Sequence, residues 1–217
     1  EIKRLSLEVH HQKRPLFHAG EFSDSLAMSH ITNDISYYFN LFKELPNSFL
    51  EFRTKSVNTR EILKETPLDN VIISYSLSPN ERTKQTDLRT PNANLRIKAM
   101  EKVIKAGHKI GIHLDPIIWD QDFEQHYQQL ILSLSKNLDL SRVVYISVGV
   151  VRFTKDVYRQ VGQNYPDSDL LAMEFIKTAD GKVRYPRPMR MKILHKVKEF
   201  LLESGFASSQ VYLCMED

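Results

Sequence analysis

Short apolar runs alternate along this chain with longer amphipathic stretches, and this alternation restricts the possible folds more than any other feature. The apolar runs have the length of strands and the amphipathic stretches have the length of helices. The pattern therefore predicts repeated βα units and a parallel sheet, which is an α/β fold. Strands are expected at residues 15–22, 49–53, 71–76, 109–114, 143–150 and 210–214.

Turn and capping residues mark the expected helices. The segment 33–43 places Ile35, Phe39 and Phe42 on one face, and Pro46 follows its end. Further helices are expected to start at Thr59, at Thr90 with Pro91, at Asp122 with Gln125 in a capping box, and at Pro188. Gly107 and Gly205 are expected to end the helices that start at Thr90 and Pro188.

The strands are too few for a closed barrel of eight, so we expect a partial, six-stranded barrel whose first β/α unit would precede Glu1. The turn at 179–182 predicts a small hairpin within about 171–186, inserted into the barrel pattern. The interpretation is one domain over residues 1–217, with the barrel core at 14–170 and a C-terminal hairpin, helix and strand at 171–217.

Composition excludes several classes of protein. No apolar run reaches the length of a membrane span, and the charged N-terminus does not resemble a secretory signal. One cysteine cannot form an internal disulfide, and this fits the expectation of a cytoplasmic protein without a membrane partner. A net charge of +3 does not by itself indicate a nucleic-acid partner.

Polar side chains follow the predicted strands at the edge where parallel sheets bind ligands. Ser23 and Asp24 either contact a ligand or cap the next helix. Lys55 either pairs with a ligand carboxylate or phosphate or stays solvated. Ser76 shares a strand face with Ser74, where the two either line a ligand site or pack beside a bulky neighbour.

His113 and Asp115 are two residues apart on one strand, so both side chains point to the same face. An H-x-D pair of this kind occurs in metal-dependent barrel hydrolases, which makes such a hydrolase the main alternative function. Asp115 could instead accept hydrogen bonds from the hydroxyls or the amine of a ligand.

Residues 182–198 contain seven Lys or Arg side chains and no acidic one. These cationic side chains either bind along a phosphate backbone, as in a noncatalytic nucleic-acid-binding module, or form a solvated helix face. The candidate nucleic-acid contacts are Arg152, Lys182, Arg184, Arg187 and Arg190. Cys214, in a terminal apolar run, is either a buried inert thiol or a hydrogen-atom donor to a radical.

A set of segments in this order resembles the spore photoproduct lyase family of radical S-adenosylmethionine enzymes: GEFSDSLA, FLEFRTKS, ISYSLSP, KAGHKIGIHLDPII, VVYISVGVVRF, DGKVRYPRP and VYLCME. The resemblance implies a partial (β/α)6 radical-SAM-type barrel, here without its first β/α unit. It also implies a 4Fe-4S cluster held by a CxxxCxxC loop, which cleaves S-adenosylmethionine to a 5′-deoxyadenosyl radical. The lyase uses this radical to reverse a thymine lesion in DNA without light.

Carried over motif by motif, the resemblance implies S-adenosylmethionine contacts at Ser23, Asp24, Lys55, Ser76 and Asp115. Lys55 would neutralise the methionyl carboxylate. No CxxxCxxC segment is present, so the cluster is expected only in an upstream-extended protein and the chain as it stands is expected to be inactive. The family's hydrogen-donating cysteine corresponds to Glu21 here, and Cys214 is the substitute that this sequence offers.

Overall fold

The computed structural model describes residues 1–9, 14–20 and 23–216. Its centre is a curved sheet of six strands in the order β1-β2-β3-β4-β5-β9, in which every neighbouring pair is parallel. The strands are β1 (Leu16–Ala19), β2 (Phe49–Thr54), β3 (Val71–Ser76), β4 (Lys109–Ile117), β5 (Val143–Val150) and β9 (Val211–Leu213). The predicted α/β class and all six predicted strand positions are confirmed.

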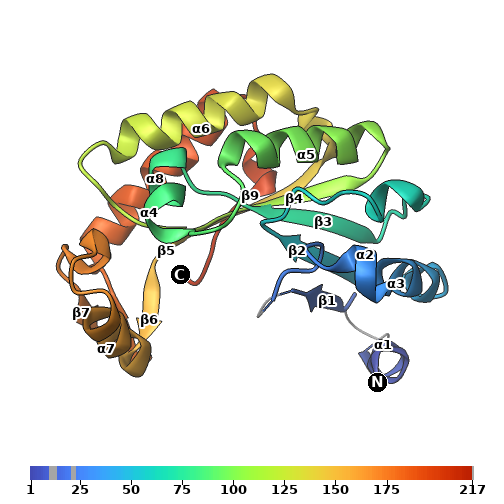
Figure 1. The fold of residues 1–217 in the computed structure, drawn as a ribbon, viewed down its shortest axis with the longest axis horizontal. Helices are drawn as coiled ribbons and strands as arrows, with labels where there is room; N and C mark the ends of the chain where they lie inside the picture. The colour runs from blue at the N-terminus through green and yellow to red at the C-terminus, as the bar shows by residue number, and fades with distance from the viewer. Residues whose placement is uncertain (10–13, 21–22, 217) are drawn as a thin grey trace.

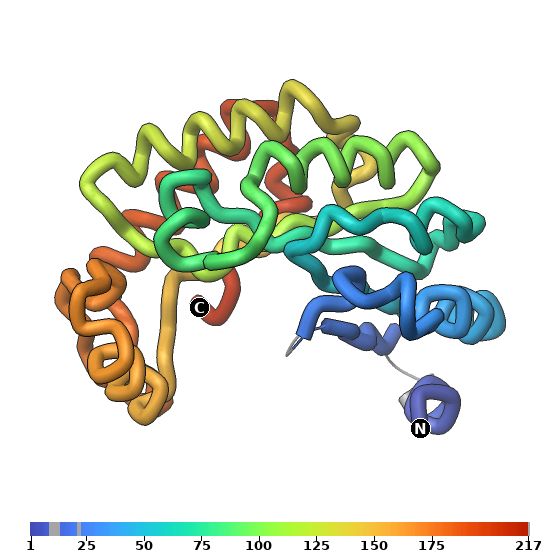
Figure 2. The backbone as a smooth tube through the Cα atoms, viewed as in Figure 1, coloured from blue at the N-terminus to red at the C-terminus, as the bar shows by residue number. Residues whose placement is uncertain are grey.

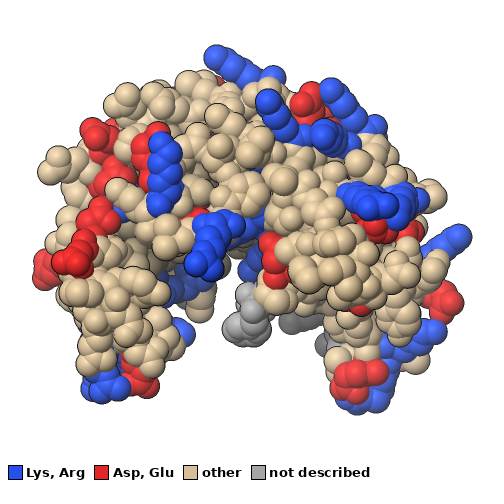
Figure 3. All heavy atoms as spheres, in the orientation of Figure 1, with Lys and Arg blue, Asp and Glu red and all other residues tan. Residues whose placement is uncertain are grey.

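The longer helices cover one face of the sheet and leave the other face without such a layer (Figure 1). The space-filling view shows that this uncovered side is hollowed (Figure 3). On the covered face lie α5 (Ala93–Lys105), α6 (Phe123–Asn137) and α8 (Arg187–Glu203), with α3 (Asp34–Lys43) beside β2. The shorter helices are α1 (Ile2–Val9), α2 (Ser29–Thr32), α4 (Asn80–Thr86) and α7 (Lys155–Asn164), and single 3-10 turns occur at Ile62–Lys64, Leu140–Arg142, Asp169–Leu171 and Ser208–Gln210. None of the described helices is long and apolar enough to cross a membrane.

The alternation of side chains along β2 decides which residues face the hollow. Leu50 and Phe52 are each 1% exposed, and the Phe52 ring stacks on Phe39 of α3 with centroids 6.2 Å apart. Because successive strand residues point to opposite faces, Glu51 and Arg53 turn toward the hollow. The packed aromatic layer against α3 thus forces a row of charged side chains into the barrel interior.

Two glycines on the hollow side make room for larger neighbours. A Cβ at Gly111 would lie 2.5 Å from the Tyr145 ring, and a Cβ at Gly149 would lie 2.6 Å from the carboxyl carbon of Asp115. Neither position accepts a side chain without moving its neighbour. These glycines allow polar groups from β4 and β5 to fill the interior of the barrel.

A second, antiparallel sheet forms an arm beside the hollow. It has the order β6-β8-β7, with β6 (Arg152–Thr154), β7 (Ile176–Lys177) and β8 (Lys182–Arg184). The predicted hairpin near 171–186 is confirmed as β7 and β8. The sequence reasoning missed β6 and α7, so this arm begins at Arg152 rather than at residue 171. In the tube view it lies across the hollow from α1 and β1 (Figure 2).

Two predicted helix caps are wrong. Asn92, not Thr90, caps α5, because the Asn92 side chain accepts a hydrogen bond from the Leu95 amide at 3.0 Å. Asp122 makes no side-chain cap for α6, and its own amide instead donates to Asp120 at 2.9 Å. The predicted helix from Thr59 is only the 3-10 turn at Ile62–Lys64. At α5 the Ala93 amide, which a cap at Thr90 would use, already donates to the Asn80 side chain at 2.9 Å.

Candidate cofactor site

A pocket of about 420 Å³ opens at the carboxyl ends of β1, β2 and β3. It brings together four of the five residues that the sequence predicts as cofactor contacts, namely Ser23, Asp24, Lys55 and Ser76. Gly20, Arg53, Thr54 and Thr90 also line it, and the sequence reasoning did not select them as contacts. The volume lies within the range of small-molecule sites.

Asp24 organises the floor of this pocket. Its Oδ1 accepts hydrogen bonds from the amides of Leu26 and Ala27, both at 2.9 Å, and from the Thr54 hydroxyl at 2.7 Å. Its Oδ2 accepts from the amide of Lys55 at 2.7 Å. The carboxylate therefore ties the loop after β1 to the end of β2, which leaves Asp24 little capacity for a ligand. The capping alternative is wrong, because the next helix, α2, follows Met28 and has no side-chain cap.

Gly20 allows this loop to turn sharply. Its φ is +82°, and an added Cβ would lie 2.3 Å from the Ser25 hydroxyl oxygen and 2.6 Å from the Arg53 carbonyl oxygen. Only glycine combines that backbone angle with that closeness. The Ser25 hydroxyl beneath this turn is buried and has no hydrogen-bond partner within the described residues.

Lys55 is held at the pocket by an ion pair with Asp87. Asp87 lies 3.5 Å from the guanidinium of Arg96, which is fully buried. Arg96 in turn donates to the Ser76 carbonyl at 2.7 Å and to the Thr90 hydroxyl at 2.5 Å. Burial lowers the pKa of Arg96 below its usual value, and Asp87 opposes this shift. One buried arginine thus links the two sides of the pocket.

Asp115 does not line this pocket. The β3–β4 register pairs Ser76 with His113, so Asp115 extends beyond Ser76, and its carboxylate lies against Gly149 of β5. Both carboxylate oxygens accept from Arg152 at 3.1 Å. The structure therefore does not bring Asp115 to the predicted group, because Asp115 lies where the β4–β5 register shifts and its side chain packs against Gly149 and pairs with Arg152.

Cys214 follows β9 and reaches the same ion pair. Its sulfur lies 3.7 Å from a guanidinium nitrogen of Arg152. Burial raises the pKa of the Cys214 thiol, with the charge of Asp115 adding to the shift, so the group stays protonated at neutral pH. This is the opposite of an activated nucleophilic thiolate.

A buried polar cluster surrounds Glu51 lower in the barrel. His113 lies 2.7 Å from its carboxylate, and His18 and Ser74 also hydrogen-bond it. Burial alone would raise the pKa of Glu51, but hydrogen bonds from His113, Ser74 and Arg53 outweigh burial and hold the pKa well below its usual value. Glu51 therefore stays ionised.

These contacts do not favour the alternative of a metal-dependent hydrolase. His113 lies between Glu51 and the Tyr145 hydroxyl, which is 3.0 Å away, while Asp115 pairs with Arg152. No three His, Cys, Asp or Glu side chains among the described residues are arranged to hold a metal ion. The H-x-D spacing places both side chains on one face of β4, but His113 and Asp115 interact with different partners there.

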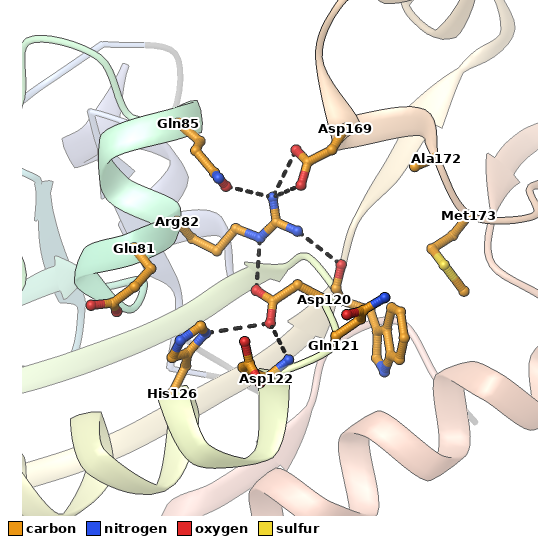
Figure 4. Close-up of a pocket in the computed structure, with 11 residues that line it drawn as sticks. Glu81, Arg82, Gln85, Asp120, Gln121, Asp122, His126, Asp169, Ala172 and Met173 are labelled. Carbon is orange, nitrogen blue, oxygen red and sulfur yellow. Dashed lines mark hydrogen bonds and ion pairs between the residues drawn. The ribbon is translucent and has the colours of Figure 1, made fainter.

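A second pocket, of about 400 Å³, lies outside the barrel around Arg82 (Figure 4). Arg82 donates to Asp120 at 3.0 Å, to both oxygens of Asp169 at 2.9 Å, to Gln85 at 2.8 Å and to the Trp119 carbonyl at 3.0 Å. This cluster joins α4 to the loop after β4 and to the segment before β7. No sequence signal identified it, because Arg82 lies in a polar helix that resembles a solvated one.

The basic run at 182–198 does not form one surface. Arg184 and Arg190 are 9% and 6% exposed, and both pair with Glu216. Arg190 also donates to the Tyr185 carbonyl at 2.7 Å. These two guanidiniums are therefore structural in this conformation, contrary to their prediction as nucleic-acid contacts, because their acidic partner lies outside the run. Lys182 is half-buried on β8 and Arg187 is exposed at the start of α8.

A curved parallel sheet with a pocket of small-molecule size at the carboxyl edge of its strands is typical of the partial (β/α) barrel class. The family model of spore photoproduct lyase matches residues 6–204. The chain therefore belongs to the spore photoproduct lyase family, as its ordered motifs predicted.

Curated relatives agree with this family. The spore photoproduct lyase of Bacillus subtilis (strain 168) is 26% identical over 156 residues, which are 71% of this chain and 46% of that protein. The spore photoproduct lyase of Geobacillus sp. (strain Y412MC61) is 26% identical over 157 residues, with the same coverage. The chain thus spans less than half the length of the curated relatives it matches.

Solved structures of spore photoproduct lyase share the fold. One complexed with dinucleoside spore photoproduct has a TM-score of 0.85 at 20% identity, and the match covers 98% of this chain and 64% of that one. A variant with bound AdoMet and dinucleoside spore photoproduct matches equally well. The match confirms the predicted radical-SAM-type architecture. Glu21, which the motif resemblance aligns with a hydrogen-donating cysteine of the family, lies outside the described residues.

Proposed function

We propose that this chain is the S-adenosylmethionine-binding barrel of a radical enzyme related to spore photoproduct lyase, acting in light-independent repair of a DNA lesion or in related radical chemistry. The observation that carries this proposal is the pocket that gathers Ser23, Asp24, Lys55 and Ser76 from three strand ends. These residues were selected from sequence motifs, and their convergence on one pocket supports a shared ligand.

The pocket offers groups that complement S-adenosylmethionine. The Lys55 ammonium has three donors, of which Asp87 takes one, so the others can bind the methionyl carboxylate. The hydroxyls of Ser23 and Ser76 suit the amine or ribose of the ligand, while Asp24 keeps the loop in place. When bound beside a reduced cluster, S-adenosylmethionine supplies a 5′-deoxyadenosyl radical.

The residues of this chain do not fit the 4Fe-4S cluster. A CxxxCxxC segment provides three thiolates, whereas this sequence contains one cysteine, and that thiol lies beside Arg152. We therefore expect the 217 residues alone to bind S-adenosylmethionine without cleaving it. The barrel's contribution is to bind and orient the ligand and to exclude water.

Cys214 is the candidate hydrogen-atom donor of this chain. A donor thiol must carry its proton, and burial keeps the Cys214 thiol protonated. In the proposed step the S–H bond breaks, a C–H bond forms on the substrate radical, and a thiyl radical remains. Replacing Cys214 with alanine should leave S-adenosylmethionine binding unchanged and abolish hydrogen return to the substrate in a cluster-containing form.

DNA is the proposed partner. Relatives with this fold have been solved with dinucleoside spore photoproduct, and in this chain Lys and Arg side chains gather along the edge of the hollow (Figure 3). A basic edge attracts the phosphates of a polynucleotide. The expected setting is the cytoplasm.

Calorimetric titration of S-adenosylmethionine tests the proposal. Lys55→Ala should weaken binding by about tenfold or more, since a charge-assisted hydrogen bond is worth about 1.5–3 kcal/mol. Ser76→Ala should weaken it less. Lys102→Ala, which removes an exposed charge on α5, is the matched control and should bind like the parent protein. Equal binding by the Lys55 variant, or no binding by the parent protein, would refute the cofactor site.

A longer form that carries a CxxxCxxC segment tests the reaction. After anaerobic reconstitution and reduction it should release 5′-deoxyadenosine from S-adenosylmethionine. Absence of that product from a protein with a full cluster would refute the radical enzyme while leaving the ligand site intact.

A further inference from the structure

A tight turn at residues 87–90 places a strained arginine beside the cofactor pocket. Arg89 has a φ of +64°, a left-handed backbone conformation that disfavours residues with a Cβ. Glycine or asparagine would adopt it at lower cost. The surrounding structure must therefore hold the turn in place, and strain of this kind is common where a side chain serves a ligand.

Several hydrogen bonds hold the turn. The Thr90 amide and hydroxyl both donate to the Asp87 carbonyl, at 3.2 and 2.7 Å. Arg96 donates to the Thr90 hydroxyl and also to the Pro91 carbonyl at 2.8 Å. The turn is consequently a rigid element rather than a loose loop.

The same contacts fix the turn relative to the cofactor pocket. The Asp87 carboxylate pairs with Lys55, Thr90 lines the pocket, and Arg96 reaches the Ser76 carbonyl. Both ends of the turn are thus bound to residues of the pocket. Its tip must stand at the pocket's edge whenever the pocket is formed.

The tip presents one apolar and one cationic side chain to solvent. Leu88 is 66% exposed and Arg89 is also exposed. Arg89 has no hydrogen bond or ion pair within the residues that the structure describes, unlike Lys55 and Arg152, which have acidic partners. An unpaired guanidinium next to an exposed leucine serves no purpose in packing this fold.

We propose that the turn 87–90 contacts the polynucleotide strand that flanks the reacting base, with Arg89 on a backbone phosphate and Leu88 against a neighbouring sugar or base. This inference rests on the proposed function, because it takes the pocket as the place of the reaction and DNA as the substrate. A guanidinium matches the geometry of a phosphate, and apolar side chains commonly contact unstacked bases beside such anchors. Because the turn is held rigidly, the contact between Arg89 and one phosphate determines which nucleotide of the bound strand lies over the pocket.

Binding of a fluorescein-labelled single-stranded thymidine oligonucleotide, measured by anisotropy at several salt concentrations, tests the inference. Arg89→Gly should weaken binding severalfold and reduce the slope of log K against log salt by about 0.7, the value for one phosphate contact on a single strand. Its melting temperature should rise, because glycine relieves the strained φ. Arg89→Asn, which also tolerates this backbone, should reproduce the loss of binding. Leu88→Ala should weaken binding without changing the slope.

Lys102→Ala removes the same charge near the C-terminal end of α5, away from the turn and outside the cofactor pocket, so it controls for net charge. The inference is overturned if the Arg89 variants bind the oligonucleotide as this control does, or if the parent protein does not bind it. It is also overturned if the Arg89 variants lose S-adenosylmethionine binding, since the turn would then act only through the pocket. If the Arg89 variants bind both S-adenosylmethionine and the oligonucleotide as the control does, only this inference is refuted. If the parent protein does not bind S-adenosylmethionine, the cofactor site itself is refuted.

Discussion

Replacing Asp24 with asparagine separates a structural role for this carboxylate from direct ligand contact. Three donors converge on Oδ1, and the Lys55 amide donates to Oδ2. Asparagine keeps one acceptor oxygen, which can serve the Leu26, Ala27 and Thr54 donors. Its NH₂ group would then face the Lys55 N–H, so two donors would oppose each other.

The magnitude follows from these contacts. The variant loses one hydrogen bond to a charged acceptor, worth about 1.5–3 kcal/mol, and weakens three others that lose the negative charge. Asp24 is only half-buried, so water can replace part of what is lost. We expect a loss of about 2–3 kcal/mol in the free energy of unfolding, and a larger loss for Asp24→Ala, which removes all four contacts.

Urea denaturation followed by circular dichroism measures this change, with S-adenosylmethionine titration on the same samples. The exposed Asp167→Asn is the matched control and should unfold like the parent protein. A midpoint shift at unchanged m-value reports stability alone. The reasoning is refuted if Asp24→Asn unfolds like the control and yet no longer binds S-adenosylmethionine, because Asp24 would then be a ligand contact rather than the organiser of the loop.

Three further predictions concern the barrel interior and the arm. Glu51→Gln should flatten the pH dependence of stability, because the lowered pKa of Glu51 makes the parent protein lose stability as pH falls below the unfolded value of about 4.3; denaturation at pH 7 and near pH 3 measures this loss. Gly149→Ala should destabilise the protein by about 1–3 kcal/mol, because its Cβ overlaps the Asp115 carboxyl, and thermal melting measures this. Arg82→Met should speed hydrogen exchange around Asp169, which loses its bidentate partner; unchanged exchange there would contradict the role of this cluster.

Much of the fold was predictable because its signals are local. Apolar runs identified all six strands of the parallel sheet, and helical periodicity identified α3, α5, α6 and α8. The alternation of strands and helices also implies that the carboxyl ends of the strands lie along one edge of the sheet. For this reason Ser23, Lys55 and Ser76 could be grouped from the sequence alone. The cap of α5 at Asn92 was missed and a side-chain cap at Asp122 was wrongly predicted, because several polar residues precede each helix and periodicity does not show which of them accepts from its first amides.

The sequence by itself determined the positions of the six strands along the chain, the polar groups at their ends and the family resemblance. The tertiary structure alone decided the partners of the charged groups: Lys55 with Asp87, Asp115 with Arg152, and Arg190 with Glu216. Periodicity specifies which face a side chain occupies, whereas an ion pair depends on how the curved sheet and its register bring distant segments together. For this reason the pocket could be anticipated, but the strained turn at Arg89 and the separation of Asp115 from the pocket could not.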